Sequence, residues 1–415
     1  MMQNAKRLSD ALGTKQIPFL SPAITPGSHC PLFGVTMAAP FIQDLAILVV
    51  GTSECCWNSK NQHVSNGGKN PFYTYVLEDS EVVFGAAQGV ADALRTIWEE
   101  CHPPAIQLVT SCVPELIGDS AEEIAETVDL PIPILIVHTS HYSSSGYYQG
   151  LSSFYSSFLP VMKCCEKKEH AVLLGTRYEN FEKSEIYRLF QEAGQQIQIP
   201  RSVEDMIYLP EAALLVVMDV TALDAAREIR SKFGTPYVRL DRICRPDEIR
   251  SVYREIDRIL GTDLDNRTAG VYKKVSSMVA QATVLWADKE FIFAAPFFLP
   301  LETALFFADM GMVPRLLLIR EFFSGDEQWA QQILDRGFDP EVASFASMGE
   351  LEENLLSMGV PLYFGPTHLH DLDRYGTLVI NPNRMTTCFG YQIPLMILDQ
   401  ILAETKCGGV KHGPV

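Results

Sequence analysis

Residues 105–128, AIQLVTSCVPELIGDSAEEIAETV, hold the pattern that decides the fold. The run AIQLVT has the length and continuous apolar character of a buried strand, and the later SAEEIAETV is typical of a helix. Apolar runs that alternate with helices indicate parallel strands covered on both faces. The stretch therefore predicts an α/β fold. Cys112 lies at the strand-to-helix turn. Three roles are consistent with a cysteine there: a buried spare thiol, a nucleophile or a metal ligand.

The same alternation starts three times along the chain. It begins with DLAILVVGT (44–52), starts again at HAVLLGT (170–176) and once more at ATVLWAD (282–288), each of which we expect to be a strand. We therefore expect three doubly wound units with parallel sheets. The predicted domains are residues 1–165 with an amphipathic C-terminal helix in 385–415, residues 166–265 and residues 266–384.

Composition and charge exclude several classes of protein. The chain has 415 residues, of which 33 are Lys or Arg and 51 are Asp or Glu, so its net charge is −18. Nucleic-acid binding requires a basic face and is not expected. The polar N-terminus lacks a signal-peptide core, and the most apolar stretch, residues 291–307, is interrupted by Pro296, Pro300 and Glu302. We expect a cytoplasmic protein without a membrane span.

Nucleotide-binding loops are missing from the sequence. It contains neither G-x-x-x-x-G-K-[ST] nor G-x-G-x-x-G after a strand. We therefore expect that this chain does not itself bind ATP or NAD.

Three of the ten cysteines share a setting. Cys30 lies in the loop ITPGSHCPLFGV, whereas Cys55, in VVGTSECCW, and Cys112 each follow a strand. The carboxyl ends of parallel strands gather functional groups at one edge of a sheet. A helix start also favours a thiolate, as an iron–sulfur ligand requires. A zinc site would show a C-x₂-C pair, and a nucleophile would need a placed histidine. A shared metal site and plain burial both remain open.

The other cysteines carry no such pattern. Plain burial is the expected role of Cys101, Cys164, Cys165, Cys244, Cys388 and Cys407.

Several stretches, in order along residues 22–400, resemble the nitrogenase component 1-type oxidoreductase family. The likeness is strongest to the β-subunit branch of the molybdenum–iron proteins and to nitrogenase-like reductases. The stretches that carry it are ITPGSHCPLFGV, VVGTSEC, EVVFGAAQGVADAL, TSCVPELIGDS and NRMTTCFGYQIPLMIL.

The resemblance implies three Rossmann-like domains around a central cleft. It also implies that Cys30, Cys55 and Cys112 ligate a 4Fe-4S or larger P-cluster-like group at a subunit interface. The spacing between the first two cluster cysteines of the family favours Cys55, and not the adjacent Cys56, as the ligand. Three thiolates do not complete a four-iron cubane, so further ligands must come from elsewhere. In this family a homologous subunit supplies them, and β-type subunits add a serine from a loop that corresponds to residues 138–150.

The sequence also departs from the catalytic α-subunit pattern. Met218 stands near the position of that subunit's second-domain cysteine and is expected to be strand core. No clear counterpart of the C-terminal cofactor histidine is found. His368 and His370 form an H-x-H that we expect to lie in a solvated loop. Nitrogen fixation by this chain alone is therefore not expected.

Three functional hypotheses follow. The first is a reductase subunit whose cluster relays electrons from an ATP-dependent iron protein to a substrate or cofactor site in a complex with a homologous component 1-like subunit. The second is a non-catalytic scaffold on which a nitrogenase-type metallocluster is assembled. The third is an α/β protein that has lost its cluster and binds partners or small molecules.

Overall fold

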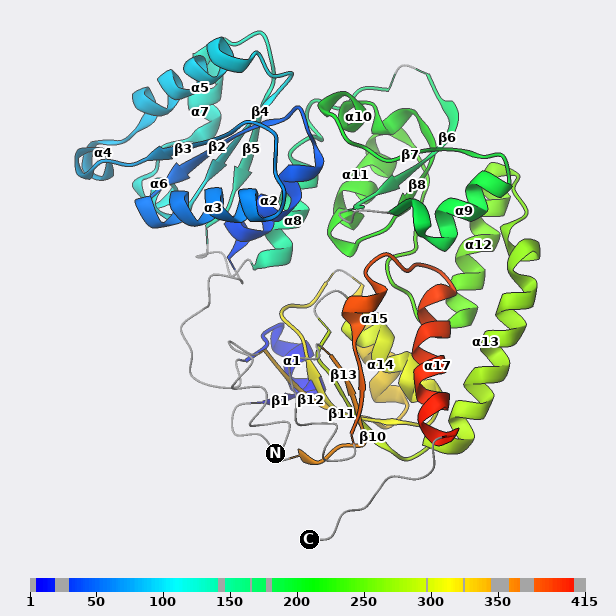
Figure 1. The fold of residues 1–415 in the computed structure, drawn as a ribbon. Coiled ribbons are helices and arrows are strands. Elements are labelled where there is room, and N and C mark those ends of the chain that lie inside the picture. Colours follow the sequence, from blue (N-terminus) through cyan, green and yellow to red (C-terminus); the bar gives the residue numbers. More distant parts are fainter. Residues whose placement is uncertain are drawn as a thin grey trace. The chain divides into compact units, whose positions relative to one another are not determined.

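The computed structural model describes residues 5–18, 30–140, 146–164, 166–176, 181–295, 298–323, 325–344, 358–365 and 377–406 (Figure 1). The chain forms two compact units. The N-terminal unit contains residues 25–177 and 197–237. The C-terminal unit contains residues 1–24, 178–196 and 238–415.

The first sheet of the N-terminal unit is parallel, with the strand order β3-β2-β4-β5. Its strands are β2 (Ala46–Gly51), β3 (Phe72–Val76), β4 (Ile106–Thr110) and β5 (Ile134–His138). The helices around it are α2 (Pro31–Ala38), α3 (Ser53–Ser65), α4 (Asp79–Phe84), α5 (Ala87–Cys101), α6 (Cys112–Ile117), α7 (Ala121–Val128) and α8 (Tyr147–Ser156).

Side-chain alternation along β2 explains why this sheet is covered on both faces. Ile47 and Val49 pack in one apolar cluster with residues of α2 and α8. Ala46, Leu48 and Val50 pack in another with residues of α5 and α7. Successive side chains of a strand point to opposite faces, so a wholly apolar strand needs helices on both sides.

A second sheet has the order β7-β6-β8-β9, and β6 and β8 are parallel. Its strands are β6 (Lys168–Leu174), β7 (Gln196–Gln198), β8 (Ala212–Val217) and β9 (Tyr237–Arg239). The helices next to it in the chain are α10 (Val203–Ile207) and α11 (Leu223–Phe233). Val172 of β6 and Val217 of β8 belong to the same apolar cluster as α2 and α8, so one core joins both sheets of the N-terminal unit.

The C-terminal unit is built on a sheet of order β1-β12-β11-β10-β13-β14, in which only the β1–β12 pair is antiparallel. Its strands are β1 (Lys6–Arg7), β10 (Glu290–Phe293), β11 (Val313–Leu318), β12 (Glu341–Ala343), β13 (Leu362–Phe364) and β14 (Leu378–Ile380). Its helices include α1 (Leu8–Thr14), α9 (Glu185–Glu192), α12 (Pro246–Leu260), α13 (Leu264–Trp286), α14 (Pro300–Asp309), α15 (Asp326–Asp335) and α17 (Gln392–Lys406).

The structure confirms the predicted α/β fold with parallel sheets, but it corrects one strand. The segment ATVLWAD (282–288) forms the last turns of α13, and the strand begins only at Glu290. Ala282 and Trp286 are buried, whereas Val284 between them is 84% exposed. Burial at a spacing of four with an exposed residue between is the pattern of a helix face. Because the segment is mostly apolar, its sequence alone does not reveal this helical periodicity.

The C-terminal helix also differs from its predicted placement. α17 contacts α13 and β14, so it packs within the C-terminal unit and not on the sheet of residues 1–165. The other predicted domain boundaries stay predictions. Across the described ranges, none of the helices combines the length and the apolar character that crossing a membrane requires.

Candidate functional site

Cys55 and Cys112 lie at the carboxyl edge of the first sheet, as the topology predicts. β2 and β4 are parallel neighbours with Val50 opposite Thr110, and the backbone N–H of Ser111 donates to the Val50 carbonyl at 3.0 Å. Cys55 lies in the first turn of α3, which follows β2, and Cys112 is the first residue of α6, which follows β4.

Gly51 at the end of β2 makes room for this arrangement. A Cβ built on Gly51 would lie 2.3 Å from Ser111 Oγ and 3.5 Å from Cys55 Cβ. Any larger residue would collide with Ser111, so the glycine allows the two loops to approach each other.

Cys30 reaches the same region from another helix. It is the N-cap residue of α2, and its carbonyl accepts a hydrogen bond from Gly34 N at 3.3 Å. α2 packs on both α3 and α8. These contacts bring the start of α2 to the start of α3.

The Cys30 thiol lies within electrostatic range of Cys55 and Cys112. Burial is the largest cause of the raised pKa of Cys30, and the backbone N–H groups of Leu32 and Phe33 oppose it. Negative charge on Cys112 and on Cys55 raises the Cys30 pKa further. Thiolates at this range repel the Cys30 thiolate, and a bound cationic metal centre would remove this penalty.

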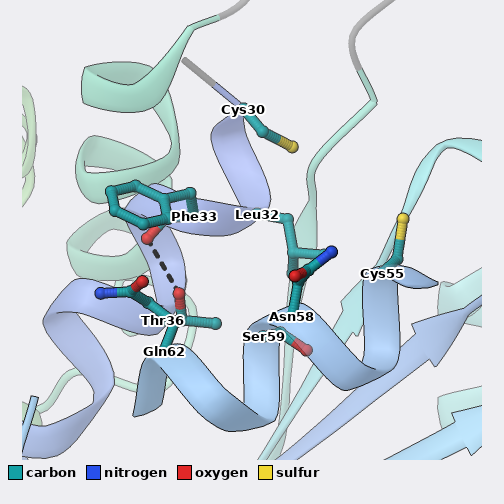
Figure 2. Close-up of a pocket in the computed structure, with 8 residues that line it drawn as sticks. All are labelled: Cys30, Leu32, Phe33, Thr36, Cys55, Asn58, Ser59 and Gln62. Carbon is teal, nitrogen blue, oxygen red and sulfur yellow. Dashed lines mark hydrogen bonds between the residues drawn. The ribbon is translucent and has the colours of Figure 1, made fainter. Parts of the chain in front are cut away.

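A hollow of about 330 Å³ opens between α2 and α3, with Cys30 at one side and Cys55 at the other (Figure 2). Leu32, Phe33 and Thr36 contribute from α2, and Asn58, Ser59 and Gln62 contribute from α3. The lining of the hollow is largely apolar, and its polar groups come from one face of α3 and from Thr36 of α2. Within the residues described, no three His, Cys, Asp or Glu side chains form a site for a single metal ion.

Cys56 has a different environment from Cys55. Its side chain is buried, and its Sγ lies 3.4 Å from the Tyr75 carbonyl oxygen and 3.8 Å from that of Val49. Burial raises its pKa to about 11, so the thiol stays protonated at neutral pH. Cys55, and not Cys56, lines the hollow.

Two of the motif segments meet just after the end of α6. The carboxylate Oδ2 of Asp119 accepts a hydrogen bond from Ala86 N at 2.6 Å, and a Cβ on Gly85 would lie 2.7 Å from Asp119 Oδ1. Gly85 has a φ of 89°, which favours glycine. The stretch EVVFGAAQGVADAL is therefore joined to TSCVPELIGDS through this carboxylate.

A charged network at the ends of β4 and β5 was not foreseen from the sequence. Glu115 Oε1 accepts hydrogen bonds from Thr110 Oγ1 at 2.8 Å and from Thr139 N at 3.0 Å. His138 Nε2 lies 2.9 Å from Glu122 Oε1. The carboxylates of Glu115 and Glu122 raise the pKa of His138 to about 9, against the effect of burial. This half-exposed imidazole is therefore cationic at neutral pH.

The other expected residues divide into three groups. Cys244, Cys388 and Met218 are buried as predicted, but Cys101 and Cys164 are exposed, so burial was the wrong expectation for these two. Cys101 follows two glutamates at the end of α5, and Cys164 lies shortly before the charged segment that leads into β6. Outside the described residues lie Cys165, His368, His370, Cys407 and positions 141–145 of the loop at residues 138–150.

The sequence matches one protein family over most of its length. Residues 30–392 match the family described as nitrogenase component 1 type oxidoreductase.

Three sequence relatives illustrate the range of similar proteins. A subunit of the light-independent protochlorophyllide reductase of Halorhodospira halophila is 23% identical over 228 residues, covering 50% of this chain and 43% of that protein. The nitrogenase iron-molybdenum cofactor biosynthesis protein NifE of Rippkaea orientalis is 25% identical over 231 residues, covering 51% and 49%. The nitrogenase molybdenum-iron protein alpha chain of Clostridium pasteurianum is 22% identical over 211 residues, covering 47% and 40%. The chain thus spans less than half the length of each of these relatives.

A solved structure is similar over nearly the whole chain. The structure titled "Nitrogenase Cp1 at pH 6.5" has a TM-score of 0.74 at 14% sequence identity and covers 98% of this chain and 100% of that chain. At this identity the similarity shows a shared fold alone.

Proposed function

The chain belongs to the nitrogenase component 1-type family of oxidoreductases, and from this premise we propose that it is one subunit of a nitrogenase-like reductase complex. In this proposal Cys30, Cys55 and Cys112 hold an iron–sulfur cluster that a second subunit completes. The observation that carries it is that Cys30, the N-cap residue of α2, lies within electrostatic range of both Cys55 in α3 and Cys112 in α6, and lines one hollow with Cys55.

The donor set suits such a group. Each thiol stands at the start of a helix, where the first-turn N–H groups and the positive end of the helix dipole offset thiolate charge. Leu32 and Phe33 line the hollow, and their backbone N–H groups oppose the rise that burial causes in the pKa of Cys30. When bound, an iron–sulfur cluster supplies one-electron transfer. The chain itself holds the thiolates, orients them and excludes solvent.

Two partners complete the proposal. Three thiolates leave ligand positions for a homologous component 1-like subunit. An ATP-dependent iron protein would deliver the electrons, and the absence of a phosphate-binding loop from these 415 residues is in accord with ATP hydrolysis on that partner. The cluster would relay the electrons to a substrate or cofactor site in the complex.

Iron and sulfide analysis tests the proposal. The chain should be purified without oxygen, alone and with a co-expressed companion subunit, and about two or four irons per chain are expected for a shared four- or eight-iron cluster. Cys30→Ala, Cys55→Ala and Cys112→Ala should each lose most of the iron. Cys101→Ala is the matched control, because Cys101 is exposed and lies at the end of α5. A wild-type complex without iron, or variants that keep full iron content, would overturn the proposal.

A second function is favoured by one of the similarities. The relative from Rippkaea orientalis is named as a cofactor biosynthesis protein, and in this chain the buried Met218 stands where the resemblance places a catalytic-subunit cysteine. The chain would then be a scaffold that releases a metallocluster. Transfer of bound metal to an apo-enzyme without reductive turnover would favour the scaffold. Turnover that depends on ATP and an iron protein would favour the reductase.

A further inference from the structure

Ser111 has an unusual role at the start of α6. It is the N-cap residue, yet its side chain makes no capping hydrogen bond. The next N-cap serine along the chain, Ser120, behaves in the ordinary way: its Oγ accepts a hydrogen bond from Glu123 N at 3.2 Å and caps α7. The hydroxyl of Ser111 therefore does not cap the helix that follows it.

This hydroxyl is buried and has no partner. Ser111 is 2% exposed, and its Oγ has no hydrogen-bond partner within the described structure. A buried hydroxyl without a partner is costly, and it persists where a function or a bound group accounts for it.

The position of the hydroxyl shows what it faces. The point 2.3 Å from Ser111 Oγ where Gly51 would carry a Cβ is also 3.5 Å from Cys55 Cβ. Ser111 also directly precedes Cys112 in the chain. The hydroxyl of the residue before Cys112 thus approaches Gly51, next to the Cys55 side chain at the carboxyl edge of the sheet.

We propose that Ser111 is a positioning residue whose hydroxyl donates a hydrogen bond to the thiolate of Cys55 when the iron–sulfur cluster is bound. The inference rests on the proposed function, because it needs Cys55 to be a cluster ligand. It assigns Ser111 no bond to iron. In this proposal the hydroxyl donates to the thiolate and therefore does not cap α6.

Such a hydrogen bond has a definite electrostatic effect. Reduction adds negative charge to the cluster and its sulfur ligands, and a donor aimed at a ligand sulfur stabilises that charge. Hydrogen bonds to the sulfurs are among the features that set cluster reduction potentials. Ser111 therefore raises the reduction potential relative to a site that lacks the hydroxyl.

The first experiment measures the midpoint potential of the bound cluster by anaerobic redox titration, followed by visible absorption and electron paramagnetic resonance. The proteins are the wild-type complex, Ser111→Ala, Ser111→Thr and Ser120→Ala. Ser111→Ala should keep wild-type iron and sulfide but shift the potential to more negative values and move the sulfur-to-iron absorption band. Ser111→Thr keeps a hydroxyl and should lie between Ser111→Ala and wild type. Ser120→Ala should leave the potential and the band unchanged.

A second measurement separates this role from a structural one. In the metal-free chain, Ser111→Ala should not lower the melting temperature, because the hydroxyl has no partner to lose, whereas Ser120→Ala should lower it through the lost cap. An unchanged potential and band in iron-replete Ser111→Ala would overturn the inference and leave the proposed function intact. A wild-type complex without iron would overturn both.

Discussion

Gly150 in α8 lies directly against the carbonyl oxygen of Pro31 in α2, so closely that a Cβ on Gly150 would be 1.9 Å from that oxygen. Gly34 makes the reciprocal contact, since its Cβ would be 2.1 Å from the carbonyl oxygen of Tyr147. The two helices meet backbone to backbone. The position of Cys30, which directly precedes Pro31, therefore depends on a glycine in a distant part of the sequence.

Gly150→Ala should displace the start of α2. The added methyl group overpacks the helix contact, and we expect a loss of about 1–3 kcal/mol in the free energy of unfolding together with a lower iron content. Urea unfolding and iron analysis measure both. Gly270→Ala is the control, because Gly270 lies in α13 with nothing within 4 Å of the added Cβ, and it should gain about 0.5–1 kcal/mol. Equal behaviour of the two variants would show that the contact does not position Cys30.

Cys55→Ala and Cys56→Ala should separate the adjacent thiols. Cys55 lines the hollow beside Cys30, whereas Cys56 packs beneath it against the carbonyl oxygens of Val49 and Tyr75. Cys55→Ala should lose bound iron at nearly unchanged stability of the metal-free chain. Cys56→Ala should keep its iron and lose about 1 kcal/mol or more from the small cavity that it leaves. Loss of iron from Cys56→Ala alone would reverse the assignment.

His63 should make the N-terminal unit sensitive to acid. Its imidazole is 2% exposed and stacks on Phe72 with ring centroids 4.5 Å apart, and neither ring nitrogen has a hydrogen-bond partner among the described residues. Burial lowers its pKa, against a weaker opposing effect of the Asn70 backbone. The unfolded chain therefore takes up the proton first, and stability falls as the pH drops below the unfolded value of about 6.5.

The measurement is the free energy of unfolding at a series of pH values from about 8 to about 5, for wild type and His63→Phe. The single titration accounts for at most about 1.4 kcal/mol per pH unit. His63→Phe should remove that part of the slope. Parallel curves for the two proteins would mean that His63 does not contribute to acid sensitivity.

His138 should act in the opposite direction. Glu115 and Glu122 raise its pKa to about 9, so its stabilising charge is fully present below the unfolded value and is lost as the pH rises through the folded one. The affected window runs from pH about 6.5 to about 9. The ring is half exposed, so solvent screening keeps the change small. His138→Gln should lack this alkaline loss in urea unfolding, and Arg95→Gln, which breaks an exposed ion pair with Asp92, is the matched surface control.

The helix–strand alternation was readable because it depends on local pattern alone. A wholly apolar strand such as AILVVG (46–51) can bury the side chains on both of its faces only inside a parallel sheet that helices cover on both sides. The structure of β2 confirms this prediction. The strand prediction for ATVLWAD (282–288) was wrong because an apolar run of strand length also fits the end of an amphipathic helix. Phe72–Val76 was overlooked as β3, since its side chains are only partly buried at the edge of the sheet and its pattern is weak.

Consecutive residues were enough to predict the α/β class, the cysteines of interest and the family that the chain resembles, because strand-to-helix turns and motif spacing are local features of a sequence. Which groups lie together depends on the tertiary structure. Burial distinguishes Cys56 from Cys55, and helix packing brings Cys30 into electrostatic range of Cys55 and Cys112. The side chain of Ser111 likewise makes no capping hydrogen bond to its own helix. These outcomes depend on helix packing and on close contacts at glycines between segments far apart in the chain, and no local pattern encodes them.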